Sequence, residues 1–241
     1  MRKYPKTEKY DKNWIKENQM GPNPIILMEE LCYNLDLHPG MKVLDMGCGK
    51  SLTSIFLAKE YGVTVFANDL WINPTDNLKR FVEAGVTDKV FPIHAEAHSL
   101  PYANGFFDAA VSIDSYHYYG ADEYFFPMIY SKLVKPGGQF GIVCPGFTQE
   151  YDNGFPDNMN ELFGNDMFTF HSKNWWQKLW GKTGIVEITA CYNIENAHEV
   201  WLDGVEKGEE FIHADKDKVV TLVVMAAVKK GHRKNVYDIC E

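Results

Sequence analysis

The chain has 241 residues, of which 45% are hydrophobic and 24% charged, as is typical of one globular domain with room for an insertion and not of a disordered chain. Its net charge is −9, and basic side chains are concentrated near both ends, so the body of the chain is more acidic than the total. Because an acidic body repels a phosphate backbone, the composition argues against a nucleic-acid partner.

Membrane and metal sites are also disfavoured. The sequence lacks an apolar run of about 18 residues, and its first residues lack the apolar core of a signal peptide. Five cysteines are scattered without a C-x-x-C pair, which argues against a disulfide framework and a structural zinc site. We therefore expect a reduced, cytoplasmic chain with no membrane association and no metal.

From residue 40 onward, short β-rich runs alternate with amphipathic segments. Helices are predicted over 24–35, 52–60, 75–84, 122–133 and 172–180. Strands are predicted over 42–46, 63–68, 89–94, 107–113, 138–144, 185–191 and 219–228. Apolar strands that alternate with helices indicate an α/β fold with a parallel sheet covered on both faces.

Two stretches do not follow this alternation. Residues 1–39 precede the first strand and form a predicted N-terminal helical segment, so the main domain is placed at 40–241. Residues 145–171 lack periodicity and are rich in aromatic side chains. A long irregular stretch inside a domain is typical of a functional loop, so we expect a lid-like insertion there.

A glycine-rich turn follows the first predicted strand, in the run Val43-Leu44-Asp45-Met46-Gly47-Cys48-Gly49-Lys50-Ser51. Such a turn lets a ligand approach the backbone at the carboxyl edge of a parallel sheet. The dinucleotide fingerprint G-x-G-x-x-G does not match, because Leu52 stands in its sixth place, and the phosphate-binding pattern G-x-x-x-x-G-K-[ST] is absent.

This run resembles the first motif, roughly D-x-G-C-G-x-G, of the small-molecule branch of class I S-adenosylmethionine-dependent methyltransferases. Ser51 stands in place of the third glycine. The resemblance implies that Asp45, Gly47, Cys48 and Gly49 lie at the cofactor. It also implies a Rossmann-like sheet of seven strands, mostly parallel, with the last strand antiparallel.

Further family elements follow in order between about residues 40 and 145. Asp69 ends the second predicted strand, where the family places a carboxylate that accepts hydrogen bonds from the ribose hydroxyls. Leu70 and Trp71 follow at the position of an apolar neighbour of adenine. Glu96 and Ala97 stand where the family has an aspartate and alanine near the adenine amino group. Lys135-Pro136-Gly137-Gly138 matches the family's turn before the fifth strand.

The segment Asp114-Ser115-Tyr116-His117-Tyr118-Tyr119-Gly120 follows the fourth strand, which faces the transferred methyl group in this family. The resemblance implies that Asp114 meets the cofactor's amino group. His117, with Tyr116, is our candidate for catalysis, because imidazole titrates near neutrality. A histidine packed among tyrosines is the alternative interpretation.

The resulting hypothesis is methyl transfer from S-adenosylmethionine to a small-molecule acceptor, with S-adenosylhomocysteine as product. The acceptor pocket is predicted above 114–119, closed by 147–170 and by the segment around 14–23. Two alternatives remain at this point: a non-catalytic protein that binds S-adenosylmethionine or S-adenosylhomocysteine, and a nicotinamide dehydrogenase. The stripe of Trp175, Trp176 and Trp180 fits core packing or an aromatic substrate cage.

Overall fold

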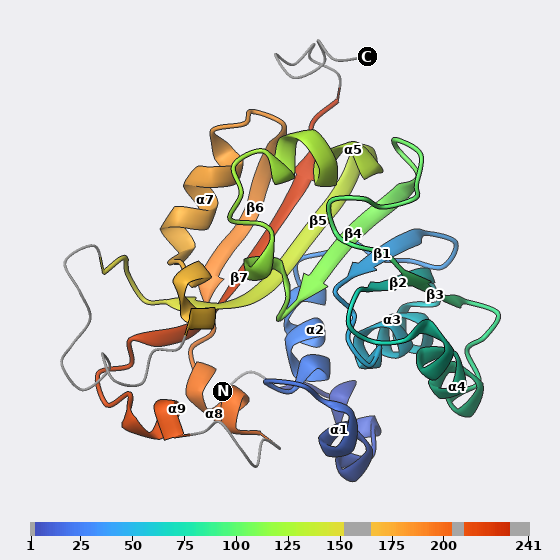
Figure 1. Cartoon of the computed structure of the whole chain (residues 1–241), viewed down its shortest axis with the longest axis horizontal. Helices are drawn as coiled ribbons and strands as arrows, with labels where there is room; N and C mark the ends of the chain where they lie inside the picture. Colours follow the sequence, from blue (N-terminus) through green and yellow to red (C-terminus); the bar gives the residue numbers. More distant parts are fainter. Residues whose placement is uncertain (1–2, 152–164, 204–209, 232–241) are drawn as a thin grey trace.

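The predicted strands pair into one seven-stranded sheet in the order β3-β2-β1-β4-β5-β7-β6. The computed structural model describes residues 3–151, 165–203 and 210–231, and Figure 1 shows its elements in sequence colours. The strands are β1 (Lys42–Met46), β2 (Thr64–Asp69), β3 (Val90–His94), β4 (Phe107–Ile113), β5 (Val134–Phe147), β6 (Val186–Asn193) and β7 (Val220–Lys229). Only β7 runs antiparallel to its neighbours β5 and β6, so the predicted fold is confirmed.

Helices connect these strands and cover both faces of the sheet (Figure 1). They are α1 (Lys12–Asn18), α2 (Pro24–Cys32), α3 (Leu52–Tyr61), α4 (Pro74–Ala84), α5 (Ser131–Leu133), α7 (Lys173–Gly181), α8 (Ala197–Leu202) and α9 (Glu210–Ala214). The short turns are η1 (Thr7–Lys9), η2 (Tyr116–Tyr118), η3 (Phe126–Tyr130) and η4 (Asn165–Thr169).

Local sequence explains where several helices begin and end. Both α2 and α4 start with an Asn-Pro pair, in which the asparagine side chain accepts backbone N–H groups and proline occupies the first helical position. Gly85 ends α4 with a φ of +69°, a conformation that glycine adopts without steric cost. The sequence therefore fixes α4 at both ends.

Alternating residues of each strand separate the core into two layers. On β1, Val43 packs in the cluster that includes α2 and α3, whereas Leu44 packs in the cluster that includes α7. The α7 layer holds Trp176 and Trp180, both with no exposed surface, so core packing is the correct interpretation of those two tryptophans. Both layers bury apolar surface, which is the main stabilising contribution to such a fold.

Two predicted elements differ from the structure. The helix predicted over 122–133 is limited to the π-helical turn η3 and the short α5. The predicted turn Lys135-Pro136-Gly137-Gly138 is part of the long β5, where the pairing register with β4 shifts between Phe107 and Ala109. In the structure, these four residues form an irregular part of strand β5 and not a separate turn.

Candidate functional site

The carboxyl ends of β1, β2 and β4 lie side by side, and the loop from Gly47 to Ser51 starts at this edge. The backbone N–H groups of Gly47 and Cys48 both donate to the Asn68 carbonyl, at 2.8 and 3.0 Å. Gly47 has a φ of +70°, and a Cβ at this position would lie 1.8 Å from Ser115 Oγ. Glycine is therefore required at Gly47 by both conformation and space.

Ser51 takes the place of the third glycine of the motif and adopts the left-handed conformation, with a φ of 62°. Its hydroxyl is buried and donates to Cys48 Sγ at 3.2 Å. Burial, followed by the nearby charges of Asp45 and Asp69, raises the pKa of the Cys48 thiol. Cys48 is thus a packed thiol and not an activated nucleophile.

Asp69 organises two loops at once. Its carboxylate accepts the backbone N–H groups of Gly49, Trp71 and Ile72, each at 2.8 Å. A carboxylate can accept about four hydrogen bonds, so capacity remains for a ligand. Asp69 also lines both of the cavities that adjoin the loop.

Asp45 lies behind the loop, fully buried, and does not line either cavity. Its Oδ2 accepts the hydroxyls of Thr53 and Ser54, both at 2.6 Å, while Oδ1 has no partner among the described residues. Burial raises the pKa of Asp45 to about 6. Its contacts fix the start of α3 beneath the loop.

Two cavities adjoin the loop, and five residues line both: Gly47, Asp69, Trp71, Ser115 and Tyr118. The first cavity, of about 120 Å³, lies between the loop and the N-terminal segment. The second cavity, of about 180 Å³, lies at the ends of β1, β2 and β3. Such crevices at strand ends are where open α/β sheets bind ligands.

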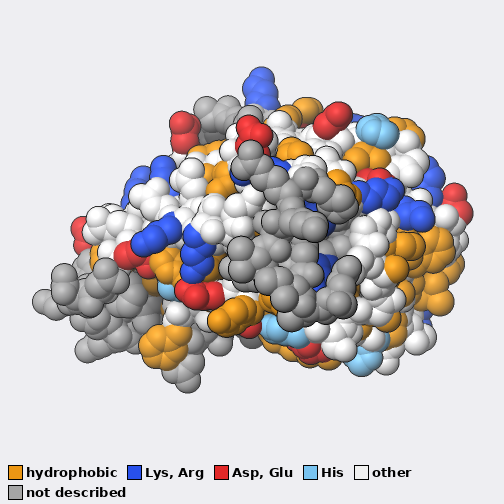
Figure 2. Space-filling model, turned by 90° about the horizontal axis from the view of Figure 1, so that it is seen from above, with side chains coloured by type: hydrophobic (Ala, Val, Ile, Leu, Met, Phe, Trp, Pro, Cys, Tyr) orange, Lys and Arg blue, Asp and Glu red, His pale blue; other side chains and the backbone are white. Residues whose placement is uncertain are grey.

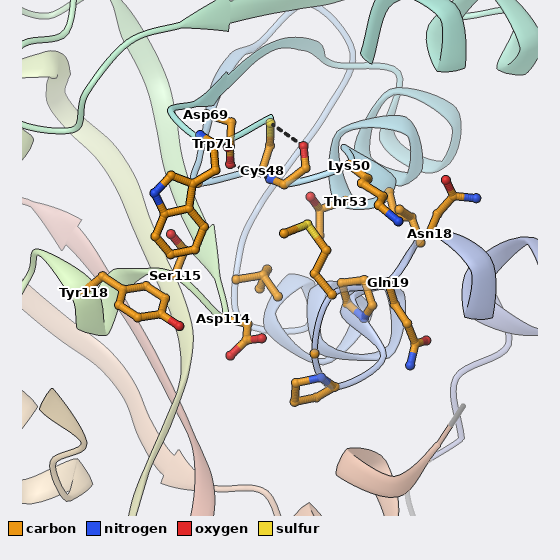
Figure 3. A pocket seen from close by; sticks show the side chains of 18 residues that line it. Asn18, Gln19, Cys48, Lys50, Thr53, Asp69, Trp71, Asp114, Ser115 and Tyr118 are labelled. Atoms are coloured by element: carbon orange, nitrogen blue, oxygen red, sulfur yellow. Dashed lines mark hydrogen bonds between the residues drawn. The ribbon is translucent and has the colours of Figure 1, made fainter. Parts of the chain in front are cut away.

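The first cavity has a charged lining. The N-terminal residues Asn18, Gln19, Met20, Gly21, Pro22 and Pro24 form one of its walls. Lys50, Asn18 and Gln19 lie on one side of it, whereas Asp114 and Tyr118 lie away from them (Figure 3). The cavity therefore has separate positive and negative groups.

Asp114 is the most unusual group of the first cavity. It follows β4 with a φ of 51°, and a Cβ on Gly21 would lie 2.2 Å from its Oδ2. None of the hydrogen bonds in the described part of the chain involves its carboxylate. Burial raises the pKa of Asp114 to about 7. A half-buried carboxylate that receives no hydrogen bond from the described residues favours a cationic ligand.

The second cavity is more apolar. Leu70, Trp71 and Ala97 line it, and the exposed Trp71 ring packs edge-on against Tyr118 at 5.3 Å between centroids (Figure 3). Glu96 also lines it and accepts the backbone and ring N–H groups of His98, at 2.8 and 2.7 Å. Asn68 Oδ1, which is buried in this lining, has no partner within the described chain.

Tyr116 and His117 line neither cavity, which corrects the expectation that they face the reacting groups. Tyr116 has no exposed surface and accepts a hydrogen bond from Trp180 Nε1 at 3.1 Å. His117 is 2% exposed, and burial lowers its pKa to about 3, so it is a weak base. The η2 turn directs both side chains into the core.

Ser115, Tyr118 and Tyr119 line the cavities instead. Sequence reasoning missed them because a strand period does not continue through a 3₁₀ turn. It also missed Lys50, which stands at a variable place in the motif.

Part of the predicted acceptor pocket lies outside the described residues, namely 152–164. The described ends of the 147–170 stretch pack near η2, because Phe170 contacts both His117 and Phe147, at 5.4 and 5.8 Å between centroids. Within the described residues, no group of three His, Cys, Asp or Glu side chains could hold a metal ion. No described helix has the length and apolarity that crossing a membrane requires.

A mostly parallel sheet with a glycine loop after β1 and a carboxylate at the end of β2 defines an α/β protein whose candidate ligand site lies at the carboxyl edge of the sheet. The sequence model of the family described as "Methyltransferase domain" matches residues 43–138. This region matches that family, and the chain has the fold of the class I S-adenosylmethionine-dependent methyltransferases, which confirms the resemblance seen in the sequence.

Among curated relatives, a sterol 24-C-methyltransferase of Yarrowia lipolytica is 27% identical over 137 residues, which cover 56% of this chain and 35% of that protein. Methyltransferase GfsG of Streptomyces halstedii is 33% identical over 118 residues, which cover 48% of this chain and 42% of that protein. The chain therefore aligns with less than half the length of either relative.

Among solved structures, the geranyl diphosphate C-methyltransferase of Streptomyces coelicolor A3(2), in complex with Mg²⁺, geranyl diphosphate and S-adenosylhomocysteine, superposes with a TM-score of 0.71. The sequences are 16% identical, and the match covers 85% of this chain and 77% of that one. At this identity the likeness concerns the fold.

Proposed function

We propose that this chain transfers a methyl group from S-adenosylmethionine to a small-molecule acceptor. The observation that carries the proposal is the pair of adjoining cavities that share Gly47 and Asp69 over the glycine loop. One cavity is apolar and the other charged, as suits a ligand with a planar base at one end and an amino acid at the other.

The residues present fit this cofactor. Leu70, Trp71 and Ala97 would pack against adenine, and the unpartnered Asn68 Oδ1 and the Glu96 carboxylate are acceptors for its amino group. Asp69 would take a ribose hydroxyl with its remaining capacity. The cavity that would surround the ribose exists because Gly47 has no Cβ.

The first cavity suits a zwitterionic amino-acid end. Asp114 would hold the ammonium group, and Lys50, whose Nζ donates to the Glu17 carbonyl at 3.1 Å, has further N–H donors for the carboxylate. Opposite charges on separate parts of the wall orient such an end in one direction. Charge-assisted hydrogen bonds of this kind are stronger than neutral ones.

The cofactor supplies an activated methyl group on a sulfonium. The protein then needs mainly to position the acceptor and exclude water, which is how much of an enzymatic rate enhancement arises. His117 lies outside both cavities, and we assign Asp114, which would be ionised beside the ligand's ammonium group, to cofactor binding and not to proton transfer. Tyr118 and Ser115 offer polar contacts beside it.

A small-molecule acceptor is supported by the relatives, whose names refer to sterols and geranyl diphosphate. Charge supports the same choice: the net charge is −9, and acidic, basic and hydrophobic side chains are interspersed on the face shown in Figure 2. A polynucleotide acceptor would need a basic surface. We place the protein in the cytoplasm, where its free Cys32, Cys48, Cys144 and Cys191 would stay reduced.

The experiment is calorimetric titration of the purified chain with S-adenosylhomocysteine and with NAD, followed by a screen of methyl transfer to small amines, phenols, thiols, acids and isoprenoids. Binding of S-adenosylhomocysteine together with turnover of an acceptor supports the proposal. Binding without any turnover favours a non-catalytic cofactor-binding protein. Binding of NAD alone would indicate a dehydrogenase.

A further inference from the structure

Two polar side chains of α4, Asn77 and Arg80, reach the wall of the first cavity from outside it. Asn77 is 1% exposed, and its Nδ2 donates to the Gly49 carbonyl at 2.9 Å. Its Oδ1 accepts Arg80 Nη1 at 3.0 Å. Both polar atoms of the Asn77 amide are used, so its orientation is fixed by its partners.

Arg80 also contacts the N-terminal segment. Its Nε donates to Asn18 Oδ1 at 3.2 Å, and the Asn18 Nδ2 in turn donates to the Trp14 carbonyl at 2.9 Å. The planar guanidinium thus joins two amide oxygens from segments far apart in sequence. Lysine, with a single charged nitrogen on a flexible stem, does not reproduce this fork.

The chain of contacts links both walls of the first cavity. Gly49 and Asn18 both line this cavity, and Asn77 and Arg80 lie between them without lining it. At its other end the N-terminal wall is held by Asp203, the residue that follows α8, because Asn23 Nδ2 donates to Asp203 Oδ2 at 2.7 Å. Arg80 is therefore one of the polar attachments that set where this wall stands relative to the glycine loop.

We propose that Arg80 and Asn77 are positioning residues that hold the N-terminal wall against the glycine loop and thereby set how long the amino-acid end of the cofactor is retained. This inference rests on the proposed function. Without the Arg80 bridge, the wall moves away from Gly49 more often, and the contacts of the first cavity are lost for part of the time. The second cavity, built from strand ends, does not depend on this bridge.

The test compares S-adenosylhomocysteine with adenosine, which lacks the amino-acid end. Dissociation rates are measured by stopped flow for the wild type, Arg80→Met, Asn18→Ala and the double variant. We expect S-adenosylhomocysteine to leave each single variant about tenfold faster, a typical coupling between sites. The double variant should release S-adenosylhomocysteine no faster than either single variant, because each single substitution already removes the bridge between Arg80 and Asn18. Adenosine should dissociate at the wild-type rate throughout.

Lys79→Met is the matched control. Lys79 neighbours Arg80 on α4, carries the same charge and pairs only with the exposed Asp76 at 2.8 Å in the described structure, so this variant should behave as wild type. Arg80→Lys should recover only part of the retention.

Three results would overturn the inference: unchanged dissociation of S-adenosylhomocysteine in Arg80→Met, equal acceleration for adenosine, or additive effects in the double variant. A wild type that binds neither ligand would instead overturn the proposed function, and this inference with it.

Discussion

The two cavities share a wall, but different parts of the chain build them. The second cavity is lined by the ends of three neighbouring strands and by η2, and its Glu96 carboxylate accepts two hydrogen bonds from His98 and can accept more. The first cavity has one wall from the N-terminal segment, which Arg80 and Asp203 hold through side chains, and its Asp114 carboxylate has no hydrogen bond within the described chain. The sheet thus provides the apolar half of the site, which is the second cavity. Side-chain hydrogen bonds position one wall of the charged half, which is the first cavity.

The largest expected effect comes from Gly47, one of the residues that line both cavities. Gly47→Ala places a methyl group against Ser115 in a left-handed backbone conformation, and it should abolish binding of both S-adenosylhomocysteine and adenosine in calorimetry. Gly85→Ala is the control: it has a similar φ of +69° and open space around it, so it should cost about 1 kcal/mol of stability and leave binding intact. Retained binding in Gly47→Ala would contradict the shared wall.

Asp114→Asn should distinguish the contributions of the two cavities to ligand binding. We expect the variant to bind S-adenosylhomocysteine about tenfold more weakly at pH 8, because a charge-assisted hydrogen bond is lost, and to bind adenosine normally. Asp76→Asn, on the exposed face of α4, is the charge-matched control. Equal weakening of both ligands would show that Asp114 acts on the fold and not on one cavity.

The pH dependence follows from the same group. Burial raises the pKa of Asp114 to about 7 in the free protein, so the carboxylate is ionised above that pH and neutral below it. Because the ligand's ammonium favours the ionised form, affinity for S-adenosylhomocysteine should fall as pH drops below about 7, by up to tenfold per pH unit. Titrations of the wild type between pH 5.5 and 8.5 should show this slope, and Asp114→Asn should be flat. If the affinity of the wild type did not change with pH, Asp114 would not be the group that holds the ammonium.

Trp71→Ala acts on the apolar half. The ring is 69% exposed, so its removal should leave stability nearly unchanged while it weakens both adenosine and S-adenosylhomocysteine by about three- to tenfold, the scale of one aromatic contact. Tyr124→Ala, an equally exposed aromatic away from either cavity, should change neither affinity. If Trp71→Ala weakened only S-adenosylhomocysteine, the base would lie elsewhere.

The smallest effect concerns a residue outside both cavities. Tyr116→Phe removes the hydrogen bond from Trp180 Nε1 and should cost about 1 kcal/mol of stability in denaturant unfolding. Turnover and cofactor affinity should stay at wild-type values. A large loss of turnover with unchanged stability would show that Tyr116 acts on the reacting groups, as the sequence analysis expected.

The sheet and the glycine loop were predictable from the sequence because their signals are local. Apolar runs of strand length, Asn-Pro helix starts and the spacing from Gly49 to Asp69 each depend on residues close in the chain. The sequence left two interpretations of His117, a catalytic one and a packed one, and the structure supports the packed one. The choice depends on the η2 turn, which directs Tyr116 and His117 into the core and follows the left-handed Asp114. Nor could the sequence place Arg80 beside Asn18, since that contact depends on tertiary packing between α4 and α1.

The most direct measurement is a crystal structure of the chain with S-adenosylhomocysteine bound. We predict that the adenine occupies the second cavity beside Trp71 and the amino-acid end occupies the first, with its ammonium at Asp114 and its carboxylate toward Lys50. A ligand bound in the reverse orientation, or outside the two cavities, would contradict this account.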